Sequence, residues 1–375
     1  MANKSFTIVT TTINVPTLLR SYAADAVRFK RQLDRFIVIG DKKTPAEAST
    51  FCAQLESDFG IECLYLSEQD QIAYLADFPG LRDLVPWNCI QRRNVGMLKA
   101  YQGGSDVVVT IDDDNFACQS DYLGFHAHVG EAQPTEAVSS ASGWWNICEM
   151  LNEGRSIPFF HRGFPLSKRF SPDAEFHASA TVTARTVVNA GLWLDDPDVD
   201  AVSRLFAPIR ATGPSRVYRD RLACDVGTWS PFNSQNTALM REAIGAYFLF
   251  PHIGRYDDIW ASYVIRTISD KFRDLVTYGA PLVRQKRNVH NYFKDFDDER
   301  LGLERNDVFL AALAACRVTA PTYAGAFAEM AEQFPEAIAK ACEGAKVDVK
   351  LFAKVSEGFG VWTKTIAGAG VAAPV

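Results

Sequence analysis

The sequence predicts an α/β protein in which a mostly parallel sheet is flanked by helices and followed by a C-terminal helical extension. Strand-like and helix-like segments alternate through the first two-fifths of the chain, as in parallel sheets with right-handed crossovers. Residues 107–111 (VVVTI) are apolar or β-branched without alternation, which is typical of a strand covered on both faces. Beyond Arg300 the chain becomes Ala-rich and helical. We therefore expect a large domain over residues 1–300 and an extension over 301–375.

The expected elements follow one another with turn residues between them, such as Asn14-Val15-Pro16 and Gly40-Asp41. From Gln133 to about Phe250 the pattern is irregular and rich in Trp, Phe, Pro and Gly, which suits long loops and antiparallel pieces that build a substrate pocket on a rigid sheet. Strands are expected at residues 6–13, 36–39, 62–66, 107–111 and 276–283. Helices are expected at residues 17–33, 44–59, 86–101, 257–272, 307–316, 323–334 and 335–343, with a frayed tail from 366.

The composition limits the classes of function. A chain of 375 residues with 47% hydrophobic residues can bury a sizeable core, and its net charge of -6 argues against a protein dominated by contacts to nucleic-acid phosphates. No segment reaches the ~20 apolar residues that a membrane span requires, and the N-terminus reads as a strand rather than a secretion leader. The eight scattered cysteines predict reduced thiols in the cytoplasm, and the histidines lack the HExxH pattern of zinc hydrolases. The sequence does not determine the oligomeric state, and a homo-oligomer is possible.

Three consecutive carboxylates end the expected strand 107–111. Buried unpaired charge is costly, so Asp112, Asp113 and Asp114 should lie where the strand emerges, at the sheet edge where α/β proteins bind ligands. Clustered carboxylates repel one another unless they share a cation, and oxygen ligands suit Mg²⁺ or Mn²⁺ that also carries phosphate. His290, in a later basic patch, is a candidate further metal ligand. The alternatives are an acidic turn and a surface imidazole.

Two basic stretches are candidates for binding an anionic substrate. Arg92, Arg93 and Asn94 lie on the expected helix 86–101, and the planar fork of arginine suits phosphate or carboxylate oxygens. Residues 161–169 (HRGFPLSKR) bring three cations and a histidine together in an acidic protein, where they could neutralise a diphosphate or steer an anion. The alternatives are a solvated helix face for the first stretch and an ordinary basic loop for the second.

An acidic pair opens the expected helix 257–272. Asp257 is a credible helix N-cap, which by itself explains one carboxylate. Asp258 lies beside Arg255 and Trp260 in the sequence and is less easily explained. An aromatic face can stack on a sugar ring, and a carboxylate beside it can orient hydroxyls or act as a base. We therefore take Asp257, Asp258 and Trp260 as candidate site residues.

Together these segments resemble the reversibly glycosylated polypeptides of plants, also called UDP-arabinopyranose mutases. The resemblance runs from about Arg92 to Phe296 and leaves the helices beyond Arg300 without a counterpart. It implies a GT-A-like, Rossmann-type glycosyltransferase fold that binds a UDP-sugar with Mn²⁺ or Mg²⁺. The closest segments are TIDDDN (110–115), RGFPLSKR (162–169), GLWLDDPDVDA (191–201) and IGRYDDIWASYVI (253–265).

The resemblance also implies roles for individual residues. Asp112, Asp113 and Asp114 become the DxD-type motif that holds the ribose and the metal-bridged diphosphate. Arg162 matches the arginine that becomes reversibly glycosylated in the family, and Arg169 matches its partner arginine, which is needed for activity. The implied reaction releases the anomeric carbon of a pentose from UDP, reopens and recloses the sugar ring, and returns the sugar to UDP. Because a guanidinium is normally protonated, Arg162 could instead act through its charge.

The sequence also departs from the family pattern. Phe-Pro-Leu-Ser-Lys-Arg at 164–169 replaces Tyr-Pro-Phe-Ser-Leu-Arg, and the segment 170–191 is longer than in the plant proteins. The main hypothesis is therefore a UDP-sugar mutase whose sugar is not fixed by the sequence. One alternative is a glycosyltransferase that moves the sugar to an unknown acceptor, with Asp257 or Asp258 as its base. The other is a non-catalytic nucleotide-sugar-binding subunit.

Overall fold

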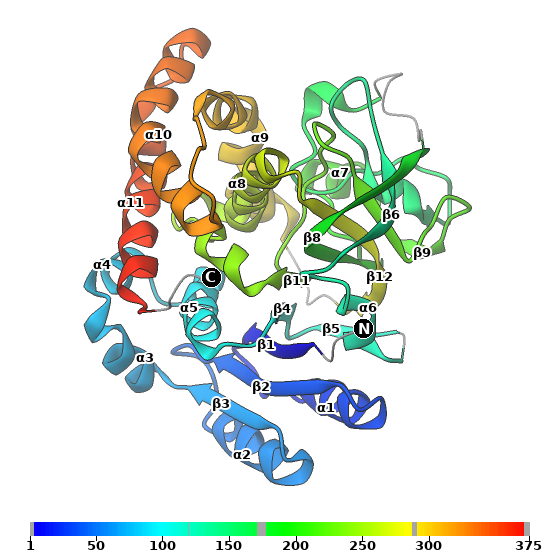
Figure 1. The fold of residues 1–375 in the computed structure, drawn as a ribbon, viewed down its shortest axis with the longest axis vertical. Helices are drawn as coiled ribbons and strands as arrows, with labels where there is room; N and C mark the ends of the chain where they lie inside the picture. The colour runs from blue at the N-terminus through cyan, green and yellow to red at the C-terminus, as the bar shows by residue number, and fades with distance from the viewer. Residues whose placement is uncertain (1–3, 119, 171–177, 287–290, 371–375) are drawn as a thin grey trace.

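A twisted sheet forms the centre of the molecule, as the computed structural model shows for residues 4–118, 120–170, 178–286 and 291–370 (Figure 1). The main strand order is β3-β2-β1-β4-β11-β8-β6-β10-β12-β5, with β7 and β9 attached to β8 through β9. The strands are β1 (Ser5–Thr11), β2 (Gln32–Ile39), β3 (Glu62–Leu66), β4 (Val107–Asp112), β5 (Asn115–Ala117), β6 (Ala132–Val138), β7 (Leu151–Glu153), β8 (Ala178–Asp195), β9 (Ala211–Pro214), β10 (Arg221–Cys224), β11 (Asn236–Met240) and β12 (Leu275–Gln285).

The first four strands carry the predicted parallel arrangement. β1 pairs in parallel with β2 and β4, and Thr11 at its end lies opposite Ile39 and Asp112. The carboxyl ends of three strands therefore meet at one edge of the sheet. Beyond β4 the sheet is mixed, because β11 runs antiparallel to β4 and β8 while β8 and β12 are parallel. The α/β fold class is confirmed, and β3-β2-β1-β4 form a continuous parallel block in a sheet that is otherwise mixed.

Helices cover both faces of the parallel strands. α1 and α2 lie on one side and α5 on the other (Figure 1). α5 comes close to the sheet at Gly96, where a Cβ atom would lie 2.6 Å from Val9 Cγ1 and 3.0 Å from Ile39 Cγ1. This close contact fixes the start of α5, and with it Arg92 and Arg93, above the strand ends. The helices before β12 are α1 (Leu19–Arg28), α2 (Glu47–Phe59), α3 (Glu68–Tyr74), α4 (Pro79–Leu84), α5 (Arg93–Gly103), α6 (Tyr122–His126), α7 (Ala201–Phe206) and α8 (Asp257–Phe272).

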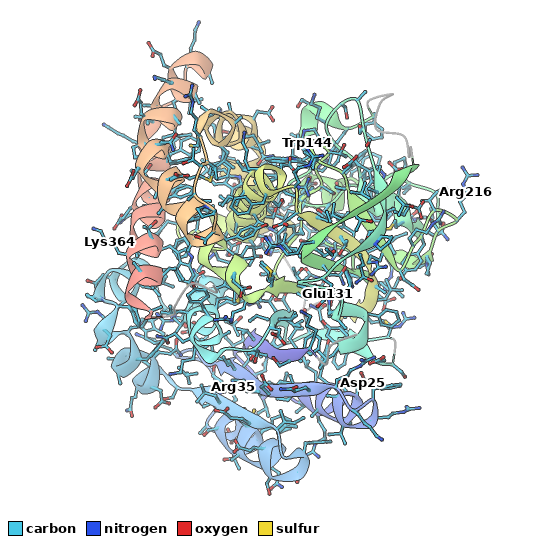
Figure 2. All side chains as sticks on the ribbon, in the orientation of Figure 1. Asp25, Arg35, Glu131, Trp144, Arg216 and Lys364 are labelled. Carbon is cyan, nitrogen blue, oxygen red and sulfur yellow. The ribbon has the colours of Figure 1, made fainter. Side chains whose placement is uncertain are left out.

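Three long helices follow β12: α9 (Tyr292–Ala315), α10 (Tyr323–Ala345) and α11 (Ala353–Gly368). In Figure 1, α10 and α11 form a long column at one side of the molecule, and Figure 2 labels Lys364 on α11. The predicted break at Pro335 is wrong, because α10 continues through it. An interior proline costs about 3 kcal/mol, and the burial of Phe334 and Ile338 on either side of it offsets this cost.

The C-terminal helices share their core with the sheet domain. Trp260 on α8 stacks on Phe309 of α9, with ring centroids 4.3 Å apart. The predicted boundary at residue 300 falls inside α9. None of the described helices has the length and apolar character needed to cross a bilayer. All eight cysteines are free thiols.

A buried histidine makes stability depend on pH. The Nε2 atom of His128 lies 3.0 Å from Thr277 Oγ1, and burial lowers the pKa of this imidazole to about 4. The unfolded chain, with a histidine pKa of about 6.5, takes up the proton first as the pH falls, so stability is lost between about pH 6.5 and pH 4. His128→Gln keeps a partner for Thr277 but cannot be protonated.

We expect this variant to lose about 1–2 kcal/mol less stability than the wild type between pH 7.5 and 5, as measured by urea unfolding. An unchanged loss would contradict this assignment.

Candidate functional site

Two adjoining cavities open where β1, β2 and β4 end, and both are lined by Cys89 and Ile90. The smaller cavity, of about 270 Å³, includes Arg92 and Asp113 in its lining. The larger, of about 450 Å³, has an acidic lining among the described residues and therefore suits a ligand that brings or shares positive charge. Its charged lining residues are Asp112, Asp114, Arg162, Asp198, Arg255, Asp257, Asp258 and Asp298.

The three strand-end aspartates face different cavities. Asp113 lines the smaller one, where its Oδ2 accepts hydrogen bonds from Thr12 Oγ1 at 2.6 Å and Asn14 Nδ2 at 3.3 Å. Asp112 and Asp114 line the larger one. The Oδ1 atom of Asp112 accepts from Nη2 of the buried Arg93 at 2.5 Å. The turn that ends β4 thus divides its carboxylates between two compartments.

The donor set in the larger cavity fits a divalent cation that is shared with a phosphate ligand. Among the described residues no three His, Cys, Asp or Glu side chains gather into a preformed metal cluster. Asp112 and Asp114 nevertheless supply two carboxylates, and Mg²⁺ commonly binds one or two carboxylates together with substrate phosphates and water. His290, the predicted third ligand, lies outside the described residues. The metal-ligand role of Asp112 and Asp114 stays a prediction.

Arg162 is a buried cation in the wall of the larger cavity, and its side chain is surrounded by acceptors. Its Nε and Nη2 atoms donate to the two carboxylate oxygens of Asp198 at 3.0 and 2.9 Å. Its Nη1 donates to Asp258 Oδ1 at 3.1 Å and to the carbonyl of Arg255. Burial disfavours the charge, but Asp198 and Asp258 outweigh it and raise the pKa of Arg162 well above its usual value. The guanidinium therefore stays protonated.

The second predicted arginine lies behind this wall. Arg169 pairs with Asp200, the N-cap residue of α7, and its guanidinium carbon lies 5.2 Å from the centre of the Phe160 ring. It lines neither of the two strand-end cavities. The loop between the two arginines is anchored by Phe164, which packs on Trp144 with ring centroids 5.8 Å apart (Figure 2 labels Trp144). The structure therefore brings Arg162, but not Arg169, to the larger cavity.

The acidic pair of α8 also lines the larger cavity. Asp258 Oδ2 accepts hydrogen bonds from the N–H and the hydroxyl of Ser234 at 2.9 and 3.1 Å. Asp257 Oδ2 accepts from Gln91 Nε2 at 2.8 Å. Burial, together with the charge of Asp258, raises the pKa of Asp257 to about 7. The predicted capping role of Asp257 is wrong, since the N-cap is Tyr256 and Asp257 is the first helical residue.

Other predicted residues lie in the protein interior. The amide of Asn94 donates to the Leu249 carbonyl at 2.8 Å and accepts from the Leu249 N–H at 3.0 Å. Trp260 is buried between α8 and α9, where its Nε1 donates to Asn306. Arg93 is fully buried beneath Asp112. None of the three lines either strand-end cavity, and the alternative of a solvated helix face for residues 92–94 is also wrong because all three are buried.

Arg92 lines the smaller cavity, although its guanidinium nitrogens donate hydrogen bonds to other residues of the protein. Its Nη2 donates to Gln71 Oε1 at 2.6 Å, and its guanidinium carbon lies 3.8 Å from the centre of the Trp87 ring. Several lining residues escaped prediction because they are isolated polar side chains, some in loops and some in regular elements, such as Gln285 at the end of β12. They are Thr12, Gln91, Asp198, Ser234, Gln235 and Gln285. Only Asp198 had a signal in the sequence, since it falls in the segment 191–201 on which the family resemblance rests.

A family model described as reversibly glycosylated polypeptide matches residues 94–368. The chain belongs to the reversibly glycosylated polypeptide family. The matched region contains the aspartate turn, the basic loop and the acidic pair of α8. It also extends through α11, so the expectation that the helices beyond Arg300 lack a family counterpart is wrong.

Named relatives and solved structures resemble the chain to different degrees. UDP-arabinopyranose mutase 3 of Arabidopsis thaliana is 31% identical over 203 residues, which cover 52% of this chain and 51% of that protein. UDP-arabinopyranose mutase 1 of rice (Oryza sativa subsp. japonica) is 29% identical over 204 residues, with 52% and 51% covered. The chain thus spans about half the length of the curated relatives it matches.

Two solved structures share a more distant likeness with the chain. A mannosyltransferase from Pyrobaculum calidifontis, in complex with GDP-Man and Mn²⁺, is 12% identical with a TM-score of 0.41, covering 98% of this chain and 86% of that one. Glucosyl-3-phosphoglycerate synthase from Mycobacterium tuberculosis, with Mn²⁺ and UDP-Glc, is 11% identical with a TM-score of 0.38, covering 83% and 79%.

The Arg162 cluster yields a stability prediction. Asp198→Asn removes the charge that binds two guanidinium nitrogens, so a buried cation loses its main partner. Breaking such a pair should lower the free energy of unfolding by about 3 kcal/mol, as measured by denaturant titration. Glu336→Gln is the matched control, because its ion pair with Lys340 is exposed and should be worth less than about 1 kcal/mol. Equal effects of the two substitutions would contradict the role of Asp198.

Proposed function

We propose that this protein is a metal-dependent nucleotide-sugar enzyme that interconverts the pyranose and furanose forms of a UDP-linked pentose. The observation that carries the proposal is that a buried, permanently charged arginine lines one cavity together with two of the strand-end carboxylates, Asp112 and Asp114. Membership of the reversibly glycosylated polypeptide family and the likeness to plant UDP-arabinopyranose mutases support it. The free cysteines support a cytoplasmic location for this activity.

The two cavities suggest how the nucleotide is divided. The smaller one suits the uridine. Thr12 orients the Asp113 carboxylate there, so that it can accept a hydrogen bond from a ribose hydroxyl. The larger one suits the diphosphate and the pentose. Asp112 and Asp114 would hold Mn²⁺ or Mg²⁺ there, and Arg93 keeps Asp112 in position. When bound, the ion neutralises charge that develops on the diphosphate as the bond to the sugar breaks.

The side chains of the larger cavity supply charge and a proton acceptor. When the bond between the anomeric carbon and the β-phosphate oxygen breaks, the oxygen keeps the electron pair, and the fixed charge of Arg162 stabilises it. A sugar hydroxyl then attacks the anomeric carbon and loses its proton, while the former ring oxygen leaves that carbon and gains one. Asp257, whose pKa is about 7, is suited to carry this proton from one oxygen to the other. The β-phosphate oxygen finally re-forms its bond to the anomeric carbon.

Arg162 acts in this scheme as a cation. The matching arginine of the family is the one that becomes glycosylated, but a protonated guanidinium has no lone pair to offer a carbon electrophile. Asp198 and Asp258 both favour the protonated form of Arg162. We therefore assign stabilisation of the departing diphosphate to Arg162, and to Arg169 the orientation of α7 through Asp200.

Ring isomerisation tests the proposal directly. Purified protein incubated with UDP-arabinopyranose and Mn²⁺ should form UDP-arabinofuranose, which chromatography separates from the substrate. Asp114→Asn should abolish both the conversion and the Mn²⁺-dependent part of UDP binding, as measured by calorimetry. Absence of conversion by the wild-type protein would overturn the proposal. Release of UDP only when an acceptor is added would instead identify a glycosyltransferase.

The proton-carrying role of Asp257 predicts a pH dependence. Above about pH 7 its carboxyl is ionised and accepts the hydroxyl proton, whereas below that pH it is already protonated. The kcat/KM of isomerisation should therefore fall about tenfold per pH unit on the acid side of 7. Asp257→Asn should remove this acid limb and slow the reaction about 10²-fold or more. Asp298→Asn, at another lining position, is the control and should retain the limb. An acid limb that persists in Asp257→Asn would contradict the role.

A further inference from the structure

Glu299, on α9, is a buried carboxylate that lies behind the larger cavity and binds two of the segments that form it. Its side chain is 1% exposed. Its Oε1 accepts from Arg255 Nε at 3.0 Å, and its Oε2 accepts from the backbone N–H of Ala201 at 2.7 Å. In Figure 1, α9 lies beside α8. One carboxylate thus joins α9 to the turn before α8 and to the start of α7.

The contact between Glu299 and Arg255 connects Glu299 to Arg162. The backbone carbonyl of Arg255 accepts a hydrogen bond from Arg162 Nη1, so the position of residue 255 sets one of the acceptors of that guanidinium. The second carboxylate near Arg255 is Asp295, whose oxygen is 3.8 Å from the guanidinium, which makes Glu299 the closer partner. The same turn lies directly on α9, because a Cβ atom on Gly254 would lie 1.8 Å from the carbonyl oxygen of Asp298.

The contact between Glu299 and the Ala201 N–H connects Glu299 to both Arg162 and Arg169. Ala201 is the first residue of α7, and Asp200 before it accepts from the Ser203 N–H at 2.8 Å and from Arg169. Asp198, which binds Arg162, lies two residues earlier. By holding the Ala201 N–H, Glu299 fixes the short segment that carries the carboxylate partners of Arg162 and Arg169.

We propose that Glu299 is a positioning residue for the isomerisation reaction, which holds the acceptors of Arg162 and Arg169 in register through Arg255 and the start of α7. This inference rests on the proposed function. It also makes α9 a part of the catalytic unit, although the sequence alone suggested an extension that begins at residue 301. Burying a carboxylate costs free energy even when each oxygen has a partner, and an apolar side chain would fill the same space without that cost. The charge of Glu299 is therefore better explained by positioning than by packing.

Glu299→Gln tests the proposal, because it keeps the size of the side chain and removes its charge. Asp274→Asn is the matched control. Asp274 is also a buried carboxylate, 2.7 Å from an Arg185 nitrogen and bound by the Tyr323 hydroxyl at 2.8 Å, but it lines neither strand-end cavity. For both variants kcat and KM for UDP-arabinopyranose, the melting temperature, and hydrogen exchange of peptides covering 160–169 and 198–206 are measured.

We expect Glu299→Gln to lower kcat about tenfold or more with KM changed less than about threefold, and to speed exchange in both peptides. Asp274→Asn should lower the melting temperature to a similar degree and leave kcat and both peptides unchanged. A Glu299→Gln enzyme with wild-type kcat, or a kcat that falls equally in both variants, would overturn the proposal. If the wild-type protein does not isomerise the sugar, the proposed function fails. Hydrogen exchange then decides the positioning role, and unchanged exchange overturns it.

Discussion

A charged guanidinium enclosed by carboxylates is the constraint on which the site depends. Arg162 can stay ionised in the interior only because Asp198 and Asp258 each bind it, since an unpaired buried charge would cost several kcal/mol. These partners come from the loop after β8 and from the start of α8. The sheet, the basic loop and α8 must therefore be in place together before the charge is compensated, which couples the geometry of the cavity to the folding of the domain.

The strand-end carboxylates follow the same principle on the other side of the cavity. Arg93 is buried beneath β4 and binds Asp112, and it also donates to the Ser234 carbonyl at 2.6 Å and hydroxyl at 2.7 Å. Ser234 in turn donates to Asp258. A continuous network of polar contacts thus joins the proposed metal ligands to the arginine cluster. Charged groups held in this way need little rearrangement when a charged ligand binds, which is the property that electrostatic catalysis requires.

Local patterns in the sequence predicted the local elements. The bounds of β3 and α8 agree with the expected 62–66 and 257–272, and the aspartates do lie where β4 leaves the sheet. Burial depends on contacts between distant segments, so the sequence did not reveal that Asn94 and Trp260 are interior residues. For the same reason the pairing of Asp198 with Arg162 and the continuation of α10 through Pro335 could not be predicted. The motifs therefore indicated the cavity and its chemistry. The residues that pair with each buried charge could be identified only from the structure.

A crystal structure with UDP-arabinose and Mn²⁺ is the most direct test of the central claim, which is that one acidic cavity holds the reacting sugar between the strand-end carboxylates and a fixed arginine. We expect uridine beside Arg92 and Asp113, the diphosphate at Asp112 and Asp114, and the anomeric carbon facing Arg162 and Asp257. A nucleotide bound elsewhere would contradict the account. One such place is a separate cavity of about 1120 Å³, whose lining includes Asn146, Phe160 and Val217. A pentose that points away from Arg162 would contradict it equally.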